Sequence, residues 1–118
     1  MNYMLLIIGN RDGEPLPEDG APPLVEQFMA YHQSVVDAGI MVDSNVLDSF
    51  ETATSVQVTS SGKRVVTDGP FAETREYLGG YYILDLPDLD AAIDWADRVP
   101  FTHTGRVEIR PIQAMPGS

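Results

Sequence analysis

The stretch YYILDL at residues 81–86 decides the fold of this 118-residue chain. Its apolar side chains fall at positions of both parities, so a strand formed here carries apolar groups on both faces. The run NYMLLIIG at residues 2–9 has the same continuous apolarity and ends at a glycine. Continuous rather than alternating apolarity is typical of strands that are covered on both sides. Both segments are therefore predicted to be strands of one well-covered sheet.

A helix is predicted after each of these two strands. The first begins at Pro22 and Pro23, where a missing N–H costs nothing, and ends at Gly39, which can adopt a left-handed cap. Asp88 is a suitable N-cap for the second, and Pro100 follows it as a stop. The two apolar stripes at helical spacing are Leu24, Phe28, Tyr31 and Val35, and Leu89, Ala92, Ile93 and Ala96.

The remaining segments supply further strands. Residues 40–47 read as a strand, and residues 54–59 and 63–67 flank a short turn containing Gly62, which predicts a hairpin. Residues 68–71 form a turn, because Pro70 lacks a donor and Gly69 permits positive φ. We expect this turn to lead into a short helical turn at residues 72–77. Residues 106–112 alternate charged and apolar side chains, as in a strand with one face in the core.

The order β-α-β, hairpin, β-α-β is the split βαβ pattern of ferredoxin-like α+β domains with an antiparallel sheet. One such domain spans residues 1–118, a length typical of a single domain. Two helices cover only one face of a sheet, so the second apolar face needs a partner. The simplest partner is a second copy of the chain, which predicts a homodimer.

The charge balance limits the partners further. Seven basic and eighteen acidic residues give a formal charge of −11. Such a field repels phosphate backbones and anionic lipid, which argues against nucleic acid and membrane surfaces as partners. The absence of cysteine removes disulfides and thiolate metal sites. The short N-terminal apolar run lacks the features of a membrane span or a signal peptide, and a cytoplasmic location is expected.

Three further stretches resemble one known family. They are VTDGPFAET at residues 66–74, LGGYY at residues 78–82 and GRVEIRPI at residues 105–112. In this order and spacing they resemble the DGPF branch of the YCII-related family. The resemblance implies a dimeric α+β barrel with a cleft beside the DGPF loop. It also implies acid/base chemistry by a His–Asp pair, whereas other DGPF proteins accompany extracytoplasmic-function sigma factors.

Asp68 and His32 are the candidate catalytic pair. A carboxylate held in the turn by Pro70 could orient or replace a histidine base. The alternative for Asp68 is an Asx-turn, in which the carboxylate accepts backbone N–H bonds. His32 lies four residues after Phe28, at the border of the first helix's apolar stripe, and could be half-buried beside a cleft. The alternative is a boundary histidine that only packs.

Four other residues are candidate ligand contacts. Phe71 could pack inward from the DGPF turn, and Tyr81 could line a small apolar pocket or fill a dimer interface. Arg110 could clamp a carboxylate, or it could pair with Glu108 on the same strand face. His103 lies in the loop before the last strand, where it could reach the cleft or remain solvated.

No metal site or cofactor is expected, because the two histidines and the carboxylates show no ligand spacing and no phosphate loop is present. The leading hypothesis is a small-molecule site that supports cofactor-free acid/base chemistry. The alternative is a non-catalytic regulatory or interaction module that acts through its dimer surface, for example beside an extracytoplasmic-function sigma factor.

Overall fold

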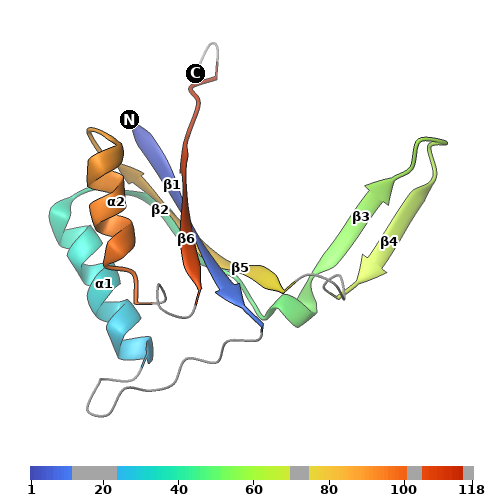
Figure 1. Cartoon of the computed structure of the whole chain (residues 1–118), viewed down its shortest axis with the longest axis horizontal. Helices are drawn as coiled ribbons and strands as arrows, with labels where there is room; N and C mark the ends of the chain where they lie inside the picture. Colours follow the sequence, from blue (N-terminus) through green and yellow to red (C-terminus); the bar gives the residue numbers. More distant parts are fainter. Residues whose placement is uncertain (12–23, 70–74, 101–104, 116–118) are drawn as a thin grey trace.

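The computed structural model describes residues 1–11, 24–69, 75–100 and 105–115, and Figure 1 shows its α+β arrangement. In chain order the elements are β1 (Asn2–Asn10), α1 (Leu24–Ala38), β2 (Met41–Val46), the short 3-10 helix η1 (Phe50–Thr52), β3 (Thr54–Val58), β4 (Arg64–Asp68), β5 (Glu76–Asp85), α2 (Leu89–Asp97) and β6 (Arg106–Pro111).

Four strands form one antiparallel sheet in the order β2-β5-β1-β6. Leu5 of β1 lies opposite Tyr82 of β5 on one side and Ile109 of β6 on the other. The two strands with continuous apolar sequences therefore occupy the centre of the sheet, where both of their edges are paired. This order, with one helix after β1 and one after β5, confirms the predicted ferredoxin-like fold.

Both α-helices cover the same face of the sheet (Figure 1). Leu5 from β1, Leu84 from β5 and Val35 from α1 are completely buried between the layers. Tyr31 of α1 lies edge-on to the rings of Tyr82 and Trp95, at centroid distances of 5.3 and 6.3 Å. Its hydroxyl donates a hydrogen bond of 3.0 Å to the Trp95 carbonyl oxygen, which joins α1 to α2. Burial raises the pKa of this phenol, so it remains a neutral donor.

None of the described helices lies on the opposite face of the sheet, and we call it the open face. Its central residues come from alternate positions of β1 and β5 and are half-buried: Met4, Leu6, Ile8, Tyr81 and Ile83. Charged residues border them on β6, where Arg106 contacts Glu76 at 2.8 Å and Glu108 at 3.2 Å. Hydrogen bonds to Glu108 and Glu76 raise the pKa of Arg106. The prediction that β1 and β5 are apolar on both faces is confirmed, and the homodimer stays a prediction.

The helix boundaries follow the expected signals, but the second apolar stripe was partly wrong. Gly39 ends α1 at φ 70°, and the Asp88 side chain accepts a hydrogen bond from the Ala91 N–H at 2.9 Å. On α2 the buried residues are Ala92 and Ala96. Leu89 and Ile93 are instead about half exposed, at 49% and 47%, because α2 turns the stripe that carries the two alanines toward the core.

The strand β5 starts earlier than expected. The prediction of a helical turn over residues 72–77 falls partly outside the described residues, and its end is wrong because Glu76 and Tyr77 pair with Asn10 and Gly9 of β1. Gly80 lies inside the strand rather than before it. A Cβ there would lie 2.8 Å from the Asn45 carbonyl oxygen, so glycine allows β2 to pair closely at this point.

The predicted hairpin is confirmed as a separate two-stranded sheet of β3 and β4. We call residues 54–68 the arm. Figure 1 shows the arm projecting from the lower end of the sheet, away from the side that carries the helices. Gly62 and Gly69 have φ of 84° and 81°, so the turn at the arm's tip and the residue directly after β4 both use the left-handed region that glycine permits.

Candidate ligand pocket

A pocket of about 900 Å³ opens between α1 and the edge of the sheet at the end of β2. It lies on the same side of the sheet as the helices and is mostly apolar. The lining residues come from β1, α1, the segment from β2 to η1, and β5: Ile7, Gly9, Leu24, Val25, Phe28, Met29, His32, Gln33, Ser44, Asn45, Val46, Leu47, Asp48, Ser49, Phe50, Tyr77, Gly79, Gly80, Tyr81 and Tyr82. A volume of this size accommodates a small organic molecule.

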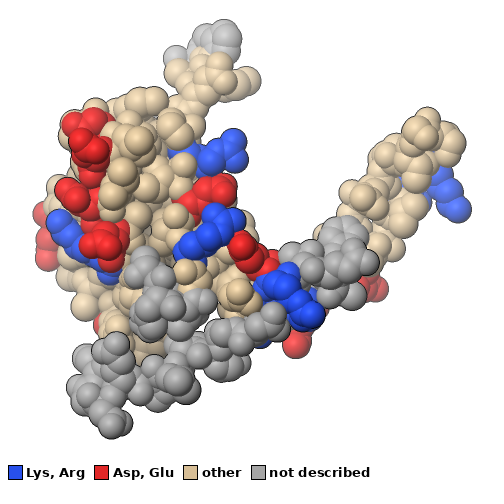
Figure 2. Space-filling model, viewed as in Figure 1, with Lys and Arg blue, Asp and Glu red and all other residues tan. Residues whose placement is uncertain are grey.

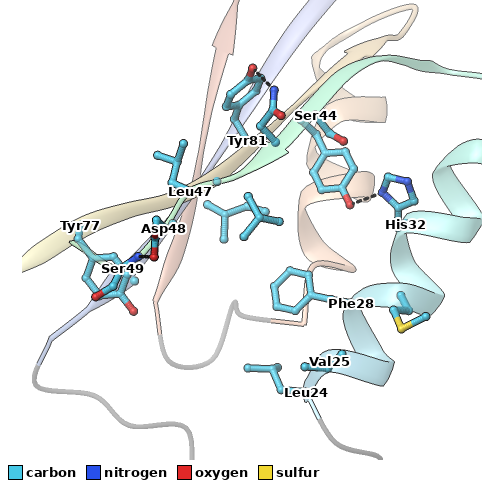
Figure 3. A pocket seen from close by; sticks show the side chains of 18 of the residues that line it. Leu24, Val25, Phe28, His32, Ser44, Leu47, Asp48, Ser49, Tyr77 and Tyr81 are labelled. Atoms are coloured by element: carbon cyan, nitrogen blue, oxygen red, sulfur yellow. Dashed lines mark hydrogen bonds between the residues drawn. The ribbon is translucent and has the colours of Figure 1, made fainter. Parts of the chain in front are cut away.

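The first half of α1 forms one wall of the pocket. Leu24, Phe28 and His32 recur every four residues and therefore share one helix face. In Figure 3 the ring of Phe28 and the side chains of Leu24 and Val25 lie across from the segment that carries Leu47 and Asp48. Val25 is 70% exposed, although apolar side chains of this kind usually lose most of their exposure on folding. This wall therefore offers apolar contact area to a bound molecule.

The polar centre of this wall is a contact between His32 and Tyr82. Nδ1 of His32 lies 2.9 Å from the Tyr82 hydroxyl oxygen, and the two rings are 5.8 Å apart. Burial raises the pKa of the Tyr82 phenol, so Tyr82 stays neutral. If His32 Nδ1–H donates to the phenol oxygen, Nε2 keeps its lone pair and can accept a proton. If the phenol donates to Nδ1 instead, Nε2–H is a donor.

The segment from β2 to η1 forms the facing wall. Asn45 Nδ2 donates to the Tyr81 hydroxyl at 2.8 Å, and that hydroxyl donates to Asp43 at 3.1 Å. Tyr81 is labelled in Figure 3. The Asp48 carboxylate accepts a hydrogen bond from the Ser49 N–H at 2.7 Å. These hydrogen bonds fix the positions of the Asn45 and Asp48 side chains in the facing wall.

Aromatic contacts fix the lower end of the facing wall. The rings of Phe50 and Tyr77 are 4.8 Å apart, and the Arg11 guanidinium lies 4.9 Å from the centre of the Phe50 ring. A cation at this distance from an aromatic ring is attracted by the ring's quadrupole. Phe50 begins η1, which leads directly into the arm, so the same ring belongs to the pocket and to the base of the arm.

Only part of the predicted site comes together in the structure. His32 and Tyr81 line the pocket, whereas Asp68 is exposed at the end of β4, outside the lining, and makes no contact with His32. Arg110 lies on β6, 70% exposed and 3.9 Å from Glu108, which is the ion pair foreseen as its alternative. Phe71 and His103 lie outside the described residues. Asp68 and Arg110 thus have no place in this pocket, and the roles predicted for Phe71 and His103 stay predictions.

Tyr82, rather than Asp68, is the partner that the structure gives His32. A signal for it was present in the sequence. Tyr82 and Leu84 share one parity of β5, and α1 covers the face to which that parity points. A histidine on the inner border of α1 must therefore meet Tyr82 or its neighbours. The segment at residues 44–50 gave no comparable signal, because its role depends on the path of the chain after β2.

Within the described residues, no group of three or more His, Asp or Glu side chains is placed to hold a metal ion. None of the helices described there has the length and apolar character needed to cross a membrane.

The fold and pocket define a ferredoxin-like α+β protein with an apolar cavity at the sheet edge. The model of the YCII-related domain matches residues 1–116, and the chain belongs to the YCII-related domain family. It is also similar to an uncharacterized protein of Rhizobium meliloti (strain 1021), with 43% identity over 63 residues. The matched part is 52% of this chain and 51% of that protein, so the similarity spans about half the length of this relative.

Proposed function

We propose that the protein binds a small, largely apolar molecule in the pocket and that His32 exchanges a proton with it. The observation that carries this proposal is the His32–Tyr82 contact of 2.9 Å within an apolar cavity of about 900 Å³. Ligand sites typically combine an apolar lining with a few convergent polar groups. The family is consistent with this function without defining it, because the matched relative is itself uncharacterized.

The charges around the pocket select against anionic ligands. The described residues that line it include Asp48 but no lysine or arginine, and the whole chain carries a formal charge of −11. An anion would therefore enter against the protein's net field and would meet no lysine or arginine among the described lining residues; the guanidinium of Arg11 lies over the Phe50 ring. The ligand class that fits is an uncharged apolar molecule with one hydroxyl, carbonyl or ionisable C–H group directed at His32.

The proton transfer uses the two ring nitrogens of His32 separately. Nδ1 is held by the Tyr82 hydroxyl, which orients the imidazole and can stabilise it when protonated. Nε2 then removes a proton from the bound molecule and returns it to another atom or to water. No cofactor takes part in this step. Asp68 lies at the end of β4, outside the pocket lining. It could assist only if the arm moved and brought its carboxylate to the pocket.

Binding is tested with N-phenyl-1-naphthylamine, an uncharged fluorescent probe of apolar cavities. Met29 lines the pocket and is 66% exposed, whereas Val36 lies on the same helix, is 47% exposed and does not line it. We expect Met29→Asp to weaken probe binding at least tenfold and the matched control Val36→Asp to leave it nearly unchanged. Equal affinities for wild type and Met29→Asp would contradict the proposed pocket.

Proton transfer is tested with His32→Gln, which can keep a hydrogen bond to Tyr82 but cannot act as a base. Once a ligand has been identified by mass spectrometry of protein purified from its host, this variant should bind it with similar affinity and lose turnover. Unchanged turnover would remove His32 from the mechanism. Asp68→Asn, measured beside it, tests the predicted catalytic carboxylate.

The assembly that completes this proposal is a homodimer in which the open faces of two chains cover each other. It is supported by the half-buried apolar residues of that face, of which Leu6 and Ile83 are examples, and by the isologous geometry that a twofold axis gives such a contact. The same face also supports the second candidate function, a non-catalytic regulatory module. A stable complex with a different protein, such as a sigma factor, and no bound ligand would favour that alternative.

A further inference from the structure

The arm is an isolated two-stranded sheet with exposed valines. Val56 of β3 lies opposite Val66 of β4, and the two are 60% and 52% exposed. Val58, two residues from Val56 and on the same face of the arm, is 70% exposed. A lone two-stranded hairpin is marginally stable in water. An arm of this kind needs another surface to cover its valines.

The shape of the chain shows that the arm does not find that surface on the part of its own protomer that the structure describes. The radius of gyration is 16.7 Å, whereas a compact chain of this length has about 13.5 Å. In Figure 2 a wide hollow separates the arm from the body of the molecule. Figure 1 shows that the hollow lies on the side of the sheet opposite the helices, so the open face and the arm border the same space.

The charge of the arm differs from that of the rest of the chain. The arm carries Lys63 and Arg64 near its turn and one acidic residue, Asp68, at its base. The rest of the chain holds the other seventeen acidic residues and only five basic ones. Figure 2 shows basic but no acidic atoms on the outer half of the arm, whereas acidic atoms gather over the helices. The arm is thus complementary in charge to the body of this same protein.

We propose that the arm clasps the body of a second copy of this chain. The second copy occupies the hollow between arm and sheet, and by twofold symmetry its own arm clasps the first. The face with Val56, Val58 and Val66 packs on the partner's body, and Lys63 and Arg64 lie among the partner's acidic residues. The inference extends the dimer through the open face by assigning a second, separate contact to the arm.

The experiment compares two faces of the arm in the full-length chain. Val56→Glu/Val66→Glu places two carboxylates on the valine face, and the matched control Ser55→Glu/Gln57→Glu places two on the reverse face of β3. Sedimentation velocity over a concentration series gives the dimer dissociation constant. We expect the valine-face variant to raise it at least tenfold and the control to raise it less than threefold. A monomeric wild type, or equal effects of the two variants, would overturn the proposal.

The fold of the body is checked in the same samples through Trp95, the single tryptophan, which lies in α2 far from the arm. Both variants should keep the wild-type fluorescence melting curve at concentrations where each is monomeric. If the valine-face variant lost that melting transition, the test would use Lys63→Glu/Arg64→Glu in its place. This variant changes only exposed residues at the tip of the arm. That variant should also weaken the dimer at least tenfold at low salt and much less at 0.5 M NaCl.

Hydrogen exchange distinguishes the clasp from a dimer held by the open face alone. Amides of residues 54–68 should become protected as the protein concentration passes through the dissociation constant. Protection of β1 and β5 without any protection of the arm would overturn the proposal and leave the open-face dimer standing. Probe binding in the pocket is measured separately, so a failed clasp and a failed ligand site give different results.

Discussion

The two faces of β1 carry nearly the same kind of side chain but have different surroundings. Tyr3, Leu5 and Ile7 point toward the helices and are buried, whereas Met4, Leu6 and Ile8 point to the open face and are half-buried. Hydrophobicity alone does not distinguish the two sets. The helices that follow in the chain decide which set belongs to the core of the protomer.

This difference teaches that one continuous apolar run can encode two interfaces. The inner set stabilises the protomer, and its burial requires only this chain. The outer set adds little to the folding of the protomer and becomes useful when a second surface arrives. Substitutions on the two sides of the same strand should therefore affect different equilibria, which makes the comparison open to experiment.

The largest expected effect is on the helix-covered face. Leu5 is completely buried, so Leu5→Ala should lower the free energy of unfolding by about 2–5 kcal/mol, through lost transfer energy and the cavity that remains. Chemical denaturation followed by Trp95 fluorescence measures this change. A loss below 1 kcal/mol would mean that the layers repack easily and that the two faces are less different than described.

The next effect concerns the open face. Leu6→Ala should cost the protomer about 1 kcal/mol or less, because its side chain is only half-buried there. The same substitution should raise the dimer dissociation constant, as measured by sedimentation velocity. If Leu6→Ala destabilised a monomeric sample as strongly as Leu5→Ala, the distinction between the faces would be broken.

A smaller effect distinguishes two tyrosines on opposite faces. Tyr31→Phe removes a part-buried hydrogen bond to the Trp95 carbonyl and should cost about 0.5–1.5 kcal/mol. Tyr81→Phe removes exposed hydrogen bonds to Asn45 and Asp43, and the cost should be near zero because water replaces these partners. Urea denaturation of the two variants at one protein concentration measures both losses of unfolding free energy. A larger loss for Tyr81→Phe than for Tyr31→Phe would contradict the comparison.

The smallest expected effect is a change of stability with pH, caused by Tyr31 on the helix-covered side. Burial raises the pKa of Tyr31 above its ordinary value near 10. The stabilisation linked to the neutral phenol is complete below pH 10, and it is lost as pH rises from there through the folded pKa, because the unfolded chain releases the proton first. Stability should therefore decline above pH 10, less steeply in Tyr31→Phe. Identical slopes would exclude this linkage.

Most of the fold was predictable because it depends on local signals. The runs at residues 2–9 and 81–86 mark the central strands, Gly39 and Asp88 mark helix boundaries, and Gly62 marks the hairpin turn. Features that depend on packing were not predictable in the same way. The sequence could not show which stripe of α2 would be buried. Ala96 and Ile93 lie on adjacent stripes, and the packing of α2 on the sheet decides which of them is covered.

The candidate site was only partly predictable for a related reason. His32 and Tyr81 both line the pocket, and their roles in catalysis and ligand binding stay predictions. The proposed pairing of His32 with Asp68 required knowledge of where the hairpin points, and the structure directs it away from the body as the arm. Tyr82 takes the place beside His32 because the strand register, and not a motif, brings it there.

The missing side chain at Gly80 has a consequence for the evolution of the pocket. Even a methyl group at this position would press on the Asn45 carbonyl and lever the end of β2 outward, together with the wall that runs to Phe50. A position that makes no contact with a ligand through its own side chain thereby sets how wide the cavity can be. Relatives that differ at this position could bind ligands of a different width while keeping His32 and Tyr82.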